Sequence, residues 1–197
     1  AMSKKQQILK DLKPKNEFFI GIDSDGCVFD TMEIKQKECF CPNFIKYFGM
    51  QKVSKYARET WEFVNLYSKT RGINRFLALI EAFRLLEQRP EVKARKMEIP
   101  DHSSLVAWTK NETKLGNPAL KEFLDDHDDD FLELTYKWSL KVNEDIADLV
   151  KGMPPFPFVK ESLEKISGSA DSIVVSQTPV EALEREWEEN EIDHFVQ

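Results

Sequence analysis

The sequence predicts an α/β fold in which a small parallel sheet is interrupted by a large all-helical insertion. Two short apolar runs, FFIGI near the start and SIVVS near the end, are typical of buried parallel strands. The long stretch between them repeats its apolar residues at helical spacing. A segment rich in glycine and proline, GMPPFPF, then marks the return to a strand-and-helix pattern.

The first predicted strand covers residues 18–22 and ends directly before the acidic segment DSDG. Residues 1–30 and 152–197 are expected to form a partial Rossmann-like core, with parallel strands and flanking helices. Residues 31–151 are expected to form a separate helical domain of some five or six helices. Within it, Ile73, Phe76 and Ile80 share one face of a predicted helix.

After GMPPFPF, the segment FVKESLEKIS predicts an amphipathic helix, and residues 172–176 a second strand. The next segment opens with the signature of a capped helix. Thr178 is the expected N-cap, Pro179 the first helical residue, and Glu181 the acid three residues after the cap. The N-terminus of this helix would offer backbone N–H groups and the positive end of the helix dipole to an anion.

Composition excludes several classes of function. The 197 residues carry a net charge of −7, which argues against a general binder of nucleic acid or of acidic membranes. No apolar stretch approaches the roughly 20 residues of a membrane span, so no membrane partner is expected. An odd number of cysteines and a charged N-terminal segment without a signal-peptide core are typical of a reducing compartment. We therefore expect a cytoplasmic protein.

Both predicted strands end in residues that suit phosphate chemistry, and ligands of open α/β sheets bind at the carboxyl ends of strands. Asp23 and Asp25 would supply a nucleophile and a proton-transfer group. Ser176 and Gln177 would offer a hydroxyl and a backbone N–H beside a helix N-terminus. The alternative for the two acids is a simple turn before glycine, and for Ser176 a plain strand end.

The segment DSDGCVFDT resembles the first motif of the haloacid dehalogenase-like phosphatase superfamily, and VVSQT resembles its second motif. The helical insertion between them resembles the cap domain of the subclass that includes β-phosphoglucomutase and phosphonatase. This resemblance implies that Asp23 forms an aspartyl-phosphate and binds Mg²⁺. It also implies that Asp25 acts as general acid and then base, with its backbone carbonyl on the metal, and that Ser176 and the N–H of Gln177 hold the phosphoryl group.

The function implied by the resemblance is Mg²⁺-dependent hydrolysis of a small phosphorylated metabolite. Asp25 favours phosphoryl transfer over dehalogenation, because the dehalogenase branch typically lacks a second acid there. Two alternatives stay open: a phosphomutase of the same superfamily, and a catalytically inactive binding module that retains the fold. The links at residues 24–31 and 152–158 are expected to let the cap open and close. The oligomeric state is left open.

The sequence also departs from the family pattern. The family has a lysine after the second motif and further acids at the end of a later strand, whereas residues 177–197 contain no lysine and place their acids on or near a helix. We therefore expect this chain to be part of a longer polypeptide. Residues 1–197 alone are expected to show no measurable phosphatase activity.

Arg71 and Arg75 flank Gly72 between two predicted helices and are candidate contacts for an anionic group of the substrate. The alternative is that they are surface arginines near a turn. Asp30 and Thr31 are expected to cap the first helix of the insertion rather than to take part in catalysis.

Cysteine and aspartate clusters in the insertion have simpler explanations than a metal site. Cys39 and Cys41 have C-x-C spacing without a second pair, so we expect buried free thiols. The run DDHDDD lacks the glycine and the spaced glutamate of a calcium loop, and is expected to be a solvated loop between helices.

Overall fold

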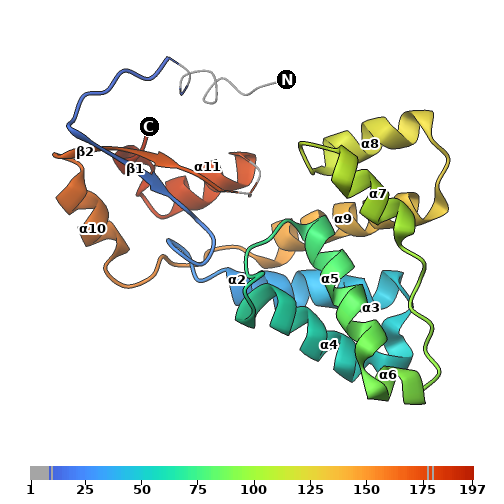
Figure 1. The fold of residues 1–197 in the computed structure, drawn as a ribbon. Helices are drawn as coiled ribbons and strands as arrows, with labels where there is room; N and C mark the ends of the chain where they lie inside the picture. Colours follow the sequence, from blue (N-terminus) through green and yellow to red (C-terminus); the bar gives the residue numbers. More distant parts are fainter. Residues whose placement is uncertain (1–8, 10, 177, 179) are drawn as a thin grey trace. The chain divides into compact units, whose positions relative to one another are not determined.

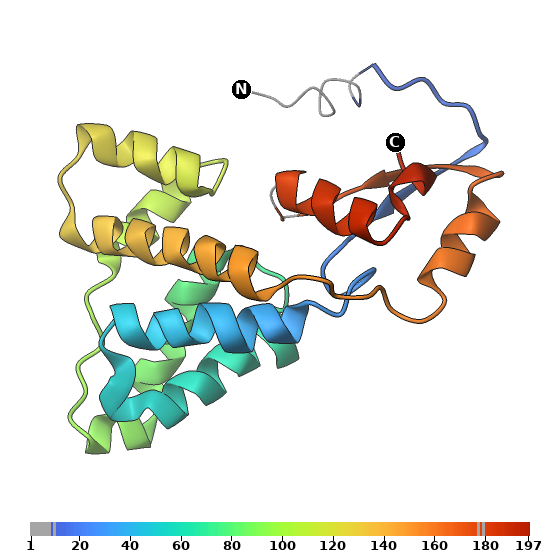
Figure 2. The ribbon, with the colours of Figure 1, turned by 180° about the vertical axis from the view of Figure 1, so that it is seen from behind.

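The computed structural model describes residues 9, 11–176, 178 and 180–197. The chain divides into two compact units, one made of Ala1–Met32 and Val150–Gln197 and the other of Glu33–Leu149. We call them the α/β unit and the helical unit; Figures 1 and 2 show each from opposite sides. A parallel sheet with helices in one unit and helices alone in the other confirm the α/β class.

The α/β unit contains a two-stranded parallel sheet. Strand β1 (Phe18–Ile22) pairs with β2 (Ala170–Val174), from Phe18 opposite Ala170 to Ile22 opposite Val174. The strands lie side by side in Figure 1, although more than 140 residues separate them in sequence. The unit also contains α10 (Val159–Ile166), α11 (Val180–Glu189) and the short 3₁₀ turn η4 (Asp193–Phe195).

The core of the α/β unit lies on one face of this sheet. Ile22 and Val174, which are paired in register, pack against five buried residues: Val28, Phe29, Leu163, Trp187 and Ile192. The opposite face carries Phe19 and Val175, which are 61% and 58% exposed. The expectation of a fully buried first strand is therefore wrong. Among the described residues, the core of this unit covers the face of β1 that carries Ile22, and Phe18 and Phe19 stay exposed.

A buried carboxylate holds the beginning of the α/β unit together. Asp171, on β2, accepts hydrogen bonds from the backbone N–H groups of Lys15 and Asn16, at 2.8 and 3.2 Å. The side-chain amides of Asn16 and Gln197 donate to its other oxygen, at 3.1 and 3.3 Å. These bonds, the one from Lys15 first, lower the pKa of Asp171 below its usual range. Gln197 also donates its backbone N–H to the carbonyl of Ser172, at 3.0 Å.

The helical unit begins within a continuous helical rod. This rod consists of α2 (Met32–Ile34), the π-helical segment η1 (Lys35–Phe40) and α3 (Cys41–Tyr47). The remaining elements are η2 (Met50–Val53), α4 (Ser54–Glu62), η3 (Phe63–Tyr67), α5 (Arg75–Gln88), α6 (Pro90–Ala94), α7 (Ser103–Asn111), α8 (Asn117–Asp126) and α9 (Asp130–Leu149). In both views α9 runs alongside the rod that ends in α3.

The helical unit contains more helical segments than the expected five or six. Arg89 is extended before Pro90, and this separates α6 from α5. Within the described residues, no helix is both long enough and apolar enough to cross a membrane.

Aromatic side chains fill the core of the helical unit. The fully buried rings include Phe44, Trp61, Phe83 and Trp138. The ring centroid of Phe44 lies 4.9 Å from that of Trp61 and 5.6 Å from that of Phe83. Burying a large apolar side chain contributes about 1.5–3 kcal/mol to folding. The helical periodicity of the insertion therefore corresponds to a real apolar core.

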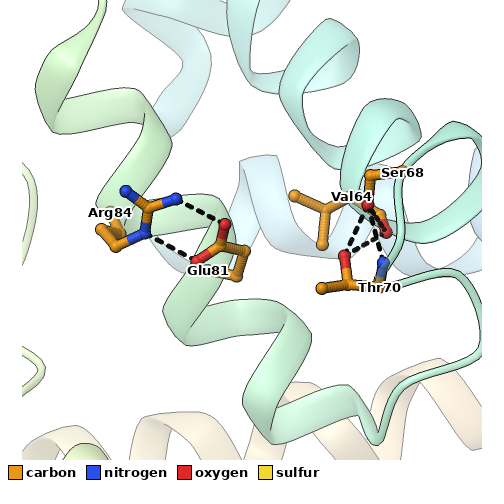
Figure 3. A network of polar contacts seen from close by, with 5 residues as sticks. All are labelled: Val64, Ser68, Thr70, Glu81 and Arg84. Atoms are coloured by element: carbon orange, nitrogen blue, oxygen red, sulfur yellow. Dashed lines mark hydrogen bonds and ion pairs between the residues drawn. The ribbon is translucent and has the colours of Figure 1, made fainter.

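The loop before α5 is fixed by short polar contacts (Figure 3). The hydroxyls of Ser68 and Thr70 both donate to the carbonyl of Val64, at 3.0 and 2.7 Å, which closes the end of η3. Gly72 follows with a φ of +78°, a backbone conformation that glycine adopts without strain. Asn74 then caps α5, since its side chain accepts the backbone N–H of Phe76 at 3.0 Å.

Candidate active site at the strand ends

The register of the sheet brings the ends of its two strands together. Ile22 and Val174 are direct neighbours, and the backbone N–H of Val175 donates to the carbonyl of Ile22 at 2.8 Å. The segments that follow β1 and β2 therefore leave the same edge of the sheet. Asp23 begins the first segment, and Ser176 lies in the second.

Asp23 presents an exposed carboxylate with a fixed orientation. Its Oδ1 accepts the backbone N–H of Ser24 at 2.8 Å. In the described part of the chain, no donor contacts its Oδ2. One oxygen is thus held while the other is available to a ligand, as a carboxylate nucleophile requires.

The loop after Asp23 is a tight turn around one carbonyl. The carbonyl of Ser24 accepts the backbone N–H groups of Val28 and Phe29, at 2.9 and 3.0 Å, and Gly26 returns its N–H to the carbonyl of Phe29 at 2.8 Å. Gly26 has a φ of +74°, so the glycine of the DSDG segment is needed for this backbone path. The buried side chains of Val28 and Phe29 anchor the loop in the core.

A second contact fixes this loop from helix α11. The hydroxyl of Ser24 is fully buried and accepts the indole N–H of Trp187 at 3.1 Å. The Trp187 ring also meets Phe29 edge to face, with the ring centroids 6.2 Å apart. The loop that carries both acids is therefore anchored to a helix that follows the second strand.

Asp25 receives hydroxyl hydrogen bonds on both carboxylate oxygens. Thr31 donates to Oδ1 at 2.5 Å, and Thr178 donates to Oδ2 at 2.7 Å. Thr178 lies 153 residues further along the chain, just after the second strand. The two predicted motifs thus meet at the carboxylate of Asp25.

Ser176 lies beside the same contact. Its hydroxyl accepts the backbone N–H of Thr178 at 3.1 Å, so Ser176, Thr178 and Asp25 form one continuous set of hydrogen bonds. Gln177 and Pro179 lie outside the described residues. The second strand ends at Val174 rather than at Ser176, which therefore belongs to the loop that leads to α11.

Three residues of this site were not predicted to belong to it. Thr31 was expected to be a helix cap, yet its buried hydroxyl binds Asp25. Thr178 was also expected to be a cap, and nothing in the sequence pattern pointed to Trp187. No local sequence signal reveals these partners, because two of the three contacts join segments more than 150 residues apart.

The two candidate arginines lie in the helical unit. Arg71 is exposed and donates to the carbonyl of Leu66 at 3.2 Å. Arg75 is largely buried, and its Nη1 contacts the carbonyl and hydroxyl of Ser139, at 3.1 and 2.9 Å, and Oδ1 of Asn143, at 2.8 Å. Burial lowers the pKa of Arg75 to about 10, so the side chain stays charged at neutral pH.

The cysteines behave as predicted for buried thiols in the helical unit. Cys39 and Cys41 are buried and free, and burial raises the pKa of Cys39 to about 11 and that of Cys41 to about 12. Cys27, in the loop after Asp25, is exposed and free. The aspartate run is mostly exposed, and Asp129 accepts the backbone N–H of Leu132 at the start of α9.

The donor types at the strand ends fit Mg²⁺. This ion prefers carboxylate and carbonyl oxygens and keeps several waters. Asp23 offers the free carboxylate oxygen described above. Among the described residues, no group of three or more His, Cys, Asp or Glu side chains could hold a metal ion. Mg²⁺ at Asp23 would therefore take most of its ligands from water.

Comparisons of the chain with protein-family models, with curated proteins and with solved structures gave no match. The interpretation of the site therefore rests on the residues and contacts described above.

Proposed function

We propose that the chain carries the phosphoryl-transfer site of an Mg²⁺-dependent phosphohydrolase of the haloacid dehalogenase-like superfamily. In this proposal the α/β unit is a Rossmann-like core and the helical unit is its cap. The observation that carries the proposal is the hydrogen bond from Thr178 to Asp25, because it joins the two motif-like segments at one carboxylate. A small phosphorylated metabolite is the proposed substrate class.

The proposed reaction uses Asp23 as nucleophile. Its Oδ2 attacks the phosphorus of a phosphate monoester, and the bond from phosphorus to the ester oxygen breaks. Protonated Asp25 gives its proton to the departing alkoxide, which leaves as an alcohol. An aspartyl-phosphate remains on Asp23. Orientation by the backbone N–H of Ser24 supports this role, because in-line displacement needs a fixed nucleophile.

Asp25 completes the cycle as a base. Its carboxylate takes a proton from a water molecule, the water oxygen attacks the phosphorus, and the acyl-phosphate bond breaks to release phosphate and restore Asp23. The hydroxyls of Thr31 and Thr178 hold the Asp25 carboxylate in one position. Bound Mg²⁺ would neutralise charge on the phosphoryl oxygens. Ser176 would bind one of these oxygens through its hydroxyl.

A second candidate function concerns residues 1–197 taken alone, since residues 177–197 contain no lysine. A site that binds a phosphoryl group without a lysine near the nucleophile would serve as a non-catalytic binding module. Both candidates require Asp23 and Mg²⁺ for anion binding, and they differ in turnover. A phosphomutase differs from a phosphohydrolase only in the acceptor of the phosphoryl group, which these residues do not specify.

Beryllofluoride binding tests the proposal, because this anion mimics a phosphoryl group on a carboxylate oxygen. We expect the 197-residue chain to bind beryllofluoride in calorimetry only when Mg²⁺ is present. Asp23→Asn should abolish the binding. Asp30→Asn should keep it, since Asp30 is an exposed acid of the same loop. Binding that persists in Asp23→Asn would remove Asp23 from the nucleophile role.

Phosphate release from a panel of monoesters separates the two candidates. We expect no measurable Mg²⁺-dependent release by residues 1–197, because no lysine follows Ser176. Robust release that Asp23→Asn eliminates would reject the binding module and support the enzyme. Beryllofluoride binding without release would support the binding module for this chain.

A further inference from the structure

Arg75 is a cation whose charge has no partner in the helical unit. It makes no ion pair with any described carboxylate, and its acceptors, the Ser139 carbonyl and hydroxyl and the Asn143 amide oxygen, are all neutral. The Phe40 ring lies 5.0 Å from the guanidinium carbon and gives partial compensation. Burying a cation without an anion is unfavourable, so this arrangement calls for an explanation.

The nearby acids are engaged elsewhere. Glu144 and Asp145 follow Asn143 on α9, but both pair with Lys141, at 3.1 and 2.9 Å. Asp145 also accepts the side-chain amide of Asn43 at 2.6 Å. Burial alone lowers the pKa of Arg75, with no opposing effect from a carboxylate. The helical unit thus leaves the charge of Arg75 uncompensated.

The guanidinium of Arg75 is fixed on one side and available on the other. All three of its hydrogen bonds are made by Nη1. Nε and Nη2 have no acceptor in the described part of the chain, and neither nitrogen is fully buried. Ser139, which donates in turn to Asn117 at 2.5 Å, and the Phe40 ring hold the plane of the group. The Nε–Nη2 edge is the edge with which arginine binds carboxylate or phosphate through two parallel hydrogen bonds.

The position of Arg75 in its helix strengthens this point. It is the first residue of α5, a helix of 14 residues, where the helix dipole is positive and disfavours a cation. Asn74, the cap of the same helix, donates to the carbonyl of Leu115, two residues before α8 begins at Asn117. The N-termini of α5 and α8 thus lie near the same guanidinium, and both favour an anion.

We propose that the Nε–Nη2 edge of Arg75, at the N-terminus of α5, is a binding site for a phosphoryl oxyanion. The ligand is either free phosphate or the phosphoryl group of a small ester. Two of its oxygens accept hydrogen bonds from Nε and Nη2 and supply the missing negative charge. This site lies within the helical unit and does not depend on the function proposed for Asp23.

Nuclear magnetic resonance of the full 197-residue chain tests the proposal directly. With the Arg75 side chain assigned through its own backbone, titration with inorganic phosphate should shift its Nε–H signal saturably. Arg75→Gln should weaken phosphate binding at least ten-fold. Arg84→Gln is the matched control, because the Arg84 guanidinium is already bound by both oxygens of Glu81, at 2.7 and 2.6 Å (Figure 3). This variant should bind phosphate as the unmodified chain does.

Further titrations separate this site from the strand ends and identify the ligand. The combined change Asp23→Asn and Ser176→Ala should leave the Arg75 shift intact. Glycerol phosphate and inorganic phosphate should both bind, and the tighter of the two identifies the source of the oxyanion. No saturable shift of the Arg75 signal in the unmodified chain would overturn the proposal, even if Arg75→Gln does not fold. Tighter binding of acetate than of phosphate would overturn it as well.

Discussion

The helical unit and the α/β unit use their side chains differently. The helical unit is held by large buried rings, such as Phe44, Trp61 and Trp138. The α/β unit has a small apolar core on one face of a two-stranded sheet, and adds hydrogen bonds to Ser24, Asp25 and Asp171. A small unit buries too little apolar surface to rely on packing alone. Polar contacts between distant segments therefore both stabilise the α/β unit and build its site.

The largest expected effect comes from removing a ring of the helical core. Phe44→Ala should lower the free energy of unfolding of the helical unit by about 3–5 kcal/mol, because the buried ring leaves a cavity among Phe48, Trp61 and Phe83. Native-state hydrogen exchange would report each unit separately. An equal loss of protection in the α/β unit would contradict this prediction, because it would show that the two units unfold together.

Thiol reactivity should differ strongly between the two units. At pH 8 in the folded chain, Cys27 should react with an aromatic disulfide reagent far faster than Cys39 or Cys41. A rise in pKa to about 11 reduces the thiolate fraction of Cys39 by about 100-fold relative to an ordinary thiol. Mass spectrometry of the labelled chain identifies each site. Three equally fast thiols would mean that the helical unit opens readily.

The contact between Ser24 and Trp187 should contribute less than a core ring. Trp187→Phe removes the indole N–H, so the buried hydroxyl of Ser24 loses this hydrogen bond. The free energy of unfolding of the α/β unit should fall by about 1–3 kcal/mol. Urea denaturation followed by circular dichroism measures this change. If beryllofluoride affinity also falls while the chain stays folded, then Trp187 positions the loop that carries Asp23.

Asp171 should give the smallest effect, seen as a change in how stability depends on pH in acid. Its pKa is lowered in the folded chain, so its contribution to stability is present above its unfolded pKa and is lost as the pH falls through the lower, folded value. Asp171→Asn should therefore flatten the dependence of α/β-unit stability on pH below about 4. Urea denaturation between pH 2 and about 5 measures the slope. An unchanged slope would assign the acid sensitivity to other carboxylates.

Local sequence patterns were sufficient to predict the elements but not their long-range contacts. The run FFIGI predicted β1 correctly, and the capping pattern around Thr178 predicted α11. The second strand was predicted at residues 172–176, two residues too late, because the segment GSAD before Ser172 has the composition of a turn. Asp171 is tolerated there because Lys15, Asn16 and Gln197 satisfy its carboxylate, and these partners are remote in sequence.

The same reasoning applies to the candidate site. Asp23, Asp25 and Ser176 were predicted from strand ends and motif spacing, and the structure places Asp25 and Ser176 in one hydrogen-bonded set. The role of Thr31 could not be predicted, because a threonine before a helix has the same local pattern whether it caps the helix or binds a carboxylate. The isolated charge of Arg75 also required the structure, since no sequence pattern reveals a missing carboxylate.

The parallel pairing of β1 with β2 has a consequence for how the chain folds. Phe18 cannot pair with Ala170 until the two ends of the long intervening segment come together. Closing so long a loop carries an entropic cost. The helical unit lies within that loop and is rich in local contacts, which form quickly. We therefore expect the helices to fold first and shorten the effective distance between the strands. The contact between Asp25 and Thr178 would then be among the last to form, so the Asp25 carboxylate would be held in place only after β2 is complete.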